Sequence, residues 1–127
     1  MEDETLTSSI IDLPFLVTKR EWTETIKMAQ RFNVFNDMDE AEEANKYLLG
    51  LSYRELKKGG ILIMKPQDIY AEGKQLWFHR YVEDWAMKVG YKFIDMFILV
   101  ADNRILSKGM SQRVARKYHS YFFVFKK

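Results

Sequence analysis

One uninterrupted apolar run limits the folds open to this chain. Residues 60–65 read Gly-Ile-Leu-Ile-Met-Lys, and Pro66 then ends the run because it lacks a backbone donor. A strand that is apolar on both faces must be covered on both faces, which is typical of parallel sheets flanked by helices. The run therefore favours an α/β fold with a buried central strand.

Length and composition indicate one domain. The 127 residues are 47% hydrophobic, with six glycines and two prolines, which excludes a disordered or low-complexity chain. The absence of cysteine excludes disulfide frameworks and thiolate metal sites. No run of about 18 apolar residues occurs and the start is acidic, so we expect neither a membrane span nor a signal peptide. We expect a single intracellular domain, cytoplasmic or nuclear, over 8–127, after a loosely ordered acidic segment at 1–7.

The order of the remaining elements predicts the sheet. The patterns predict strands over 8–13, 61–65, 93–100 and 119–125, and helices over 20–32, 39–58 and 74–89, with Gly59-Gly60 and Gly90 as helix stops. Helices separate the first three strands, which implies right-handed crossovers and parallel pairing. The last two strands have no helix between them and should pair antiparallel. The expectation is a mixed sheet of about four strands with three helices.

Charge is distributed unevenly along the chain. Residues 1–50 carry 5 basic and 11 acidic groups, a net −6, whereas residues 51–127 carry 15 and 7, a net +8. The polar loop after the third predicted strand contains basic residues without an acid from Asn103 onward: Arg104, Lys108, Arg113, Arg116 and Lys117. Such a field attracts nucleic acid or another polyanion, although a solvated loop has the same composition.

Several chemical signatures are missing from the sequence. No two glycines have G-x-G spacing, and no G-K-[ST] occurs, so the turns that receive dinucleotides or phosphates are absent. His79 and His119 lie far apart in the sequence, and without cysteine or an H-E-x-x-H motif we expect ordinary packing or surface roles for them and no metal site.

The end of the first predicted strand is the most informative segment. Asp12, Pro14 and Phe15 follow the apolar Ile10-Ile11 pair and should lie at the carboxyl edge of the sheet, where open α/β sheets bind ligands. The carboxylate could accept a hydrogen bond from an amine, and the ring could stack on a planar base. On composition alone, the simpler interpretation is that Asp12-Leu13-Pro14 terminates the strand and Phe15 fills the core.

These segments, taken in order, resemble the C-terminal half of class I S-adenosylmethionine-dependent methyltransferases. The nearest branch methylates exocyclic amines of DNA or RNA bases, and Asp12-Leu13-Pro14-Phe15 resembles its D-P-P-[YFW] motif. The passage 56–65 and the ending 119–126 resemble the family's L-K-x-G-G-x-L-x-x-K passage and its final strand. The resemblance covers nearly the whole chain from Ser8. Leu13 departs from it by replacing the first proline of the motif.

The resemblance implies a partial Rossmann-like sheet that lacks the cofactor-binding N-terminal half. It implies that Asp12 accepts a hydrogen bond from the target amine, that Pro14 shapes the loop, and that Phe15 stacks on a flipped base. The five basic loop residues would contact phosphates. S-adenosylmethionine would bind only with a partner chain, because the family's glycine loop has no counterpart here.

Three functions remain open at this level. The chain could be the substrate-side half of a methyltransferase, inactive alone, that associates as a homodimer or with a complementing chain through the edge strand 8–13. It could instead be a non-catalytic nucleic-acid-binding or regulatory module. The third possibility is an unrelated small α/β domain, which would be favoured by a last strand that does not insert antiparallel between its neighbours.

Overall fold

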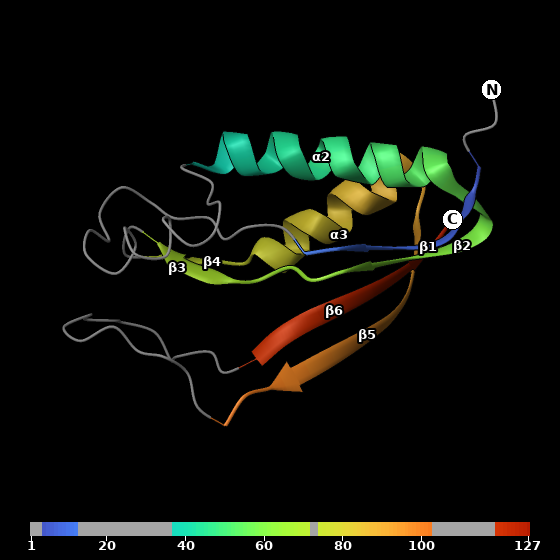
Figure 1. The fold of residues 1–127 in the computed structure, drawn as a ribbon. Helices are drawn as coiled ribbons and strands as arrows, with labels where there is room; N and C mark the ends of the chain where they lie inside the picture. Colours follow the sequence, from blue (N-terminus) through green and yellow to red (C-terminus); the bar gives the residue numbers. More distant parts are fainter. Residues whose placement is uncertain (1–3, 13–36, 72–73, 103–118) are drawn as a thin grey trace, which may run out of the picture.

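The computed structural model describes residues 4–12, 37–71, 74–102 and 119–127 (Figure 1). Its elements are β1 (Leu6–Ile11), α2 (Met38–Glu55), β2 (Leu56–Met64), β3 (Ile69–Ala71), β4 (Lys74–Leu76), α3 (Phe78–Val89), β5 (Lys92–Val100) and β6 (His119–Lys126). The predicted helix over 20–32 lies outside the described residues, which contain two of the three helices expected. Neither described helix has the length and hydropathy that a membrane span requires.

The main sheet has the order β1-β2-β6-β5. β1 pairs parallel with β2, and β6 pairs antiparallel with both β2 and β5. The prediction of a mixed sheet whose last strand is antiparallel is thereby confirmed. β6 inserts between β2 and β5, which is the order that counts against an unrelated small domain. The short strands β3 and β4 form a separate two-stranded hairpin.

Both described helices pack on one face of the sheet. Figure 1 places α2 and α3 on the same side of the strands. The core between these layers contains apolar side chains from both the sheet and the helices: Ile11, Leu62, Met64, Phe123 and Phe125 from the strands, and Leu49, Val82, Trp85 and Ala86 from the helices. The other face of the sheet carries Ile10, which is 74% exposed, and no helix among the described residues covers that face.

The boundary between α2 and β2 differs from the prediction. The helix begins as expected, with the Asp37 side chain accepting the amide hydrogen of Glu40 at 2.8 Å. It ends at Glu55 instead of Lys58, because Leu56 is already extended and its side chain is fully buried. Gly59 has a φ of 79° within β2, where the pairing with β1 shifts register between Leu6 and Ser8. The two glycines therefore form an irregularity in the strand and not the helix stop.

The start of α3 also differs from the prediction. The predicted helix over 74–89 begins only at Phe78, because Lys74–Leu76 pairs with Ile69–Ala71 as the β3–β4 hairpin. Its end is confirmed: Val89 is the last helical residue, and Gly90 follows with a φ of 123°. A side chain at Gly90 would meet the Tyr53 hydroxyl 2.9 Å from its Cβ, so only glycine fits this turn.

Candidate functional site at the carboxyl edge of the sheet

The carboxyl ends of β1 and β2 bring chemistry-bearing residues together. Ile11 pairs with Met64, and the Lys65 amide donates to the Ile11 carbonyl at 3.1 Å, so Asp12 and Lys65 leave the sheet side by side. β6 runs the other way and enters at the same edge, where Phe123 pairs with Met64. Three strands therefore contribute to one rim, as expected for a ligand site in an open α/β sheet.

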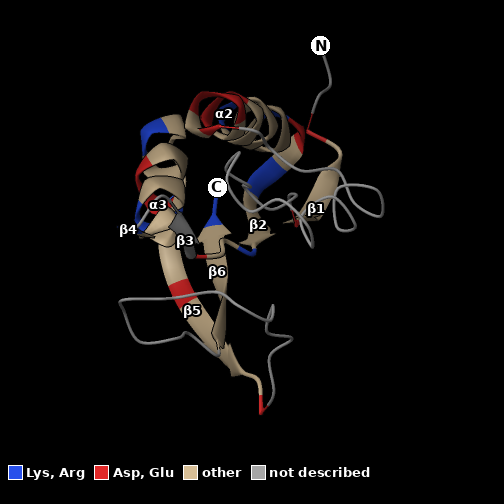
Figure 2. Cartoon of the chain, turned by 90° about the vertical axis from the view of Figure 1, so that its left-hand side faces the viewer, with Lys and Arg blue, Asp and Glu red and all other residues tan. Residues whose placement is uncertain are grey.

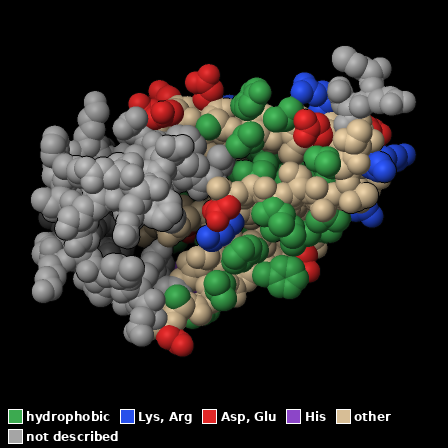
Figure 3. Space-filling model, viewed as in Figure 1, with side chains coloured by type: hydrophobic (Ala, Val, Ile, Leu, Met, Phe, Trp, Pro, Cys, Tyr) green, Lys and Arg blue, Asp and Glu red, His purple; other side chains and the backbone are tan. Residues whose placement is uncertain are grey.

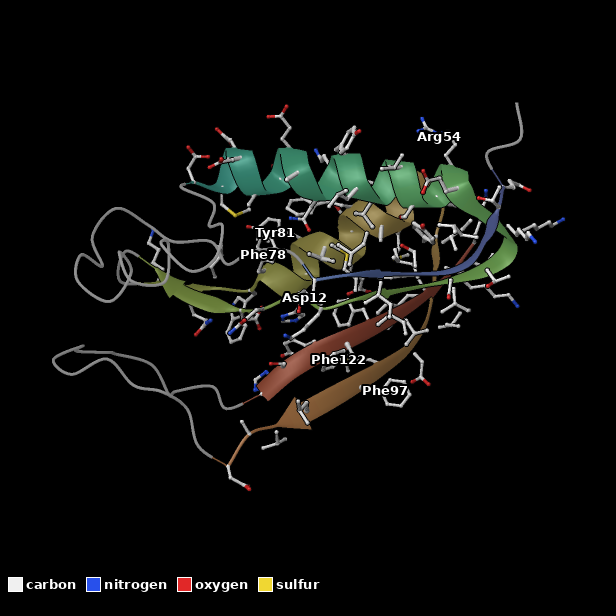
Figure 4. All side chains as sticks on the ribbon, in the orientation of Figure 1. Asp12, Arg54, Phe78, Tyr81, Phe97 and Phe122 are labelled. Atoms are coloured by element: carbon white, nitrogen blue, oxygen red, sulfur yellow. The ribbon has the colours of Figure 1, made fainter. Side chains whose placement is uncertain are left out.

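Asp12 lies at this rim (Figure 4), and its carboxylate is open to solvent. Its Oδ2 lies 3.2 Å from Lys65 Nζ, and its side chain is 58% exposed, against 30% for Lys65. The same Nζ lies 6.0 Å from the centre of the Phe122 ring. An ion pair this exposed contributes little stability, so either partner can exchange the other for a ligand group at low cost. Asp12 can thus accept a hydrogen bond from an incoming amine.

A second carboxylate at the rim is buried. Asp68 lies four residues after the end of β2, and its side chain is 2% exposed. His79 donates to it twice: the backbone amide at 3.1 Å, and ring Nδ1, which lies 2.7 Å from each carboxylate oxygen. An ionised carboxylate only accepts hydrogen bonds, so the ring hydrogen belongs on Nδ1. This contact fixes the start of α3 against the loop that follows β2.

Tyr121 completes this buried group from β6. Its ring centre lies 4.5 Å from that of His79, and the His119 ring follows at 4.8 Å from Tyr121. Burial raises the pKa of the Tyr121 hydroxyl, and the negative charge of Asp68 raises it further. The phenol is therefore held in its neutral, hydrogen-donating form. The His79 side chain is 21% exposed, so part of the ring still reaches solvent at the rim.

The other predicted site residues lie outside the described residues. These are Pro14 and Phe15, which follow Asp12, and the basic residues Arg104, Lys108, Arg113, Arg116 and Lys117. β5 ends and β6 begins on either side of the basic segment. Among the described residues, no group of three or more His, Asp or Glu is arranged to hold a metal ion.

Sequence reasoning did not identify Asp68 and His79 as a pair. A signal existed for Asp68, since it is an acid shortly after an apolar strand and within two residues of a proline, as Asp12 is, although the order of acid and proline is reversed. No sequence signal pointed to His79. Its contact with Asp68 spans the β3–β4 hairpin, and the sequence patterns predicted a loop and the start of a helix for that segment. Lys65 was identified as part of the family-like passage but not as the partner of Asp12.

Comparisons with known proteins define the fold. No family model and no curated protein matches the sequence. Two solved structures of a candidate DNA modification methylase from Thermus thermophilus match 91% of this chain with a TM-score of 0.54 and 16% identity, one of them complexed with S-adenosyl-L-methionine. A methyltransferase from Archaeoglobus fulgidus, described as dependent on the same compound, matches 88% of this chain and 75% of its own at 15% identity, but its TM-score of 0.40 is too low to support an argument.

The methylase is longer than the part that matches. This chain spans 45% of the complexed methylase and 46% of the uncomplexed one, less than half the length of that protein. At 16% identity the likeness concerns the course of the backbone and not the identity of the site residues. The strand order and this likeness agree, and the chain has a methyltransferase-like α/β fold.

Proposed function

We propose that this chain is the acceptor-binding part of an S-adenosylmethionine-dependent methyltransferase that modifies amino groups of nucleic-acid bases. The observation that carries the proposal is the strand order β1-β2-β6-β5, with β6 antiparallel, superposing on a candidate DNA modification methylase over 91% of this chain. The open Asp12 carboxylate, at the end of β1 where the resemblance requires an acid, supports it.

Asp12 would bind the target amine in this proposal. In the free chain, Lys65 Nζ donates a hydrogen bond to the Asp12 carboxylate, and an incoming amine would replace Lys65 as the donor. Pro14 and Phe15 take the roles that the resemblance gives them, shaping the loop and stacking on the base. A base inside a duplex cannot reach this rim, so the target nucleotide must be unstacked or single-stranded. The five basic residues between β5 and β6 would hold the phosphates.

The described residues do not fit the methyl donor. A cofactor of this type is received by glycine turns at the carboxyl ends of strands. The two described glycines with positive φ, Gly59 and Gly90, lie near the start of β2 and before β5, at the opposite edge of the sheet. We therefore assign the cofactor contacts to a partner chain, which would pair with the outer edge of β1.

Binding measurements test the acceptor role on the chain as it is. We expect fluorescence anisotropy to show salt-dependent binding of a labelled single-stranded oligonucleotide. Arg113→Glu combined with Arg116→Glu should weaken this binding at least about tenfold. The matched control is Lys57→Glu with Lys58→Glu, two exposed basic residues near the start of β2, which should leave binding unchanged. Equal loss in both double variants, or no binding at all, would contradict the proposal.

Turnover separates the enzyme from a non-catalytic module. In a preparation that transfers methyl groups, Asp12→Ala should stop transfer while oligonucleotide binding stays within about twofold of the unmodified chain. A non-catalytic module would show binding without transfer under any pairing. Calorimetric titration of S-adenosylmethionine into the chain alone should show no tight binding, and tight binding would overturn the assignment of the cofactor contacts to a partner.

A further inference from the structure

The outer strand β5 leaves an unusual amount of apolar surface uncovered. Six of its side chains are large, hydrophobic and between 43% and 68% exposed: Ile94, Met96, Phe97, Ile98, Leu99 and Val100. Five of them, at 96–100, are consecutive, so they point alternately to the two faces of the sheet. Both faces of the strand are therefore apolar and open. Figure 3 shows hydrophobic side chains gathered on the face of the molecule where β6 and β5 lie.

The exposure follows from the different lengths of the strand pairings. β2 pairs with β6 only as far as Met64 opposite Phe123, whereas β5 continues along β6 to Val100 opposite His119. The outer part of the β5–β6 pair is thus a two-stranded ribbon that extends beyond the end of β2 (Figure 2). Along one edge of this ribbon, the outer side of β5, the described part of the chain places no further strand.

Features that protect strand edges are confined to the first half of β5. The pairing is irregular between Phe93 and Asp95, and the Asp95 carboxylate accepts the amide hydrogen of Met96 at 2.8 Å. Bulges and inserted charges of this kind discourage edge pairing. From Phe97 to Val100 the strand has no charge, no proline and no bulge. This second half is a free template for another strand.

We propose that a second copy of this chain pairs antiparallel with β5, edge to edge, around a two-fold axis near Phe97. An antiparallel pair of identical edges is self-complementary, so the same apolar side chains cover one another on both faces of the joined sheet. Asp95 and Asp102 are the only charged residues between 93 and 102, which disfavours nucleic acid or another polyanion as the occupant.

The exposed area is sufficient for such an interface. Six side chains of this size at about half exposure present roughly 500 Å² of apolar surface per chain, near the upper end of what single proteins leave uncovered. That is well over half of the roughly 800 Å² that each partner buries in a standard interface. Strand pairing adds the backbone of β5 to this area. The inference goes beyond the proposed function and does not depend on it.

The other edge of the sheet is the natural control. β1 reads Leu-Thr-Ser-Ser-Ile-Ile, has six residues against nine, and carries two exposed large hydrophobic residues, Leu6 and Ile10. The sequence alone predicts association through this edge, over residues 8–13. The exposed apolar side chains instead favour β5 as the edge that pairs with a second copy. The edge of β1 then remains for the partner chain to which we assign the cofactor contacts.

Light scattering after size-exclusion chromatography tests the proposal on the full chain. We expect a mass of twice 15.2 kDa at micromolar concentrations. Phe97→Lys or Leu99→Lys should weaken the dimer at least about tenfold, because a lysine on an edge strand opposes pairing. The matched control Ile10→Lys, at a site that is 74% exposed, should leave the mass unchanged. A monomeric unmodified chain, or a dimer dissociated only by Ile10→Lys, would overturn the proposal.

Spin labelling gives a second readout, the proximity of the same position in two copies. The chain has no cysteine, so Phe97→Cys and Ile10→Cys each create one labelling position. Labels at 97 should show strong dipolar coupling between copies, because they lie next to the two-fold axis, and labels at 10 should not. Coupling at 10 alone, or at neither position, would contradict pairing through β5. A complex with a protein other than a second copy would leave the labels at 97 uncoupled and would also overturn it.

Discussion

Two aspartates at the same edge of the sheet have opposite surroundings. Asp12 follows β1 directly, is 58% exposed and contacts Lys65 Nζ at 3.2 Å. Asp68 follows β2 by four residues, is 2% exposed and receives both the backbone amide and ring Nδ1 of His79. The chemical group and the location are the same. Burial and the number of donors are what differ.

The comparison shows how burial assigns roles to identical groups. A buried carboxylate must have donors, because losing hydration without replacement costs several kcal/mol, and those donors then hold it in one place. Asp68 is therefore suited to fixing the geometry of the rim. An exposed carboxylate loses little on changing partner, so Asp12 is suited to binding a substrate group. A fixed partner and an exchangeable one thus belong to two aspartates of the same rim.

The largest effect should come from removing the buried group. We expect Asp68→Ala to lower the free energy of unfolding by about 3 kcal/mol, since it removes the buried acceptor of both the backbone amide and the ring Nδ1 of His79. Urea denaturation followed by circular dichroism measures it. Asp84→Ala is the control, because that carboxylate is 59% exposed and pairs with Lys88 on the surface of α3; it should cost less than about 0.5 kcal/mol. Equal losses would mean that burial does not distinguish the two sites.

A double-mutant cycle isolates the contact itself. Combining Asp68→Ala with His79→Ala should give a coupling energy of roughly 2 kcal/mol, because the cycle isolates the hydrogen bond between the His79 ring and the Asp68 carboxylate. Only the side-chain bond is lost in His79→Ala, so that single variant should be milder than Asp68→Ala. Strict additivity of the two substitutions would show that Asp68 is stabilised by other groups.

The sequence predicted the sheet well and the rim only in part. The apolar runs that became β2, β5 and β6 indicated the strands, with Pro66 after β2 and Gly90 before β5 as breakers. The presence or absence of a helix between successive runs indicated the strand directions. The end of α2 was misjudged by three residues, since pairing of Leu56 with Leu6 of β1 prevailed over local helix propensity. The Asp68–His79 contact could not be foreseen, because it depends on a hairpin whose strands have three residues each.

Tyr121, whose pKa responds to the charge of Asp68, should make the stability of the folded chain depend on pH in the alkaline range. The pKa of Tyr121 is raised in the folded chain, by burial and by the charge of Asp68, above its ordinary value of 10.0. The folded state thus retains a proton that the unfolded state has lost, and stability falls as pH rises from about 10 through the folded pKa. We expect Tyr121→Phe to reduce this loss by less than about 1 kcal/mol, measured as melting temperature against pH. An identical alkaline slope would contradict the assignment.

The smallest effect on stability should come from the open pair. Asp12→Ala, Lys65→Ala and the double variant should each change the free energy of unfolding by less than about 0.5 kcal/mol, with a coupling energy near zero at physiological salt. The reason is that both side chains remain hydrated, so the ion pair replaces contacts with water that are nearly as favourable. Denaturation at low and high salt measures the coupling. A coupling energy as large as that between Asp68 and His79 would mean that Lys65 binds Asp12 firmly. Asp12 would then be unable to release Lys65 for an incoming amine.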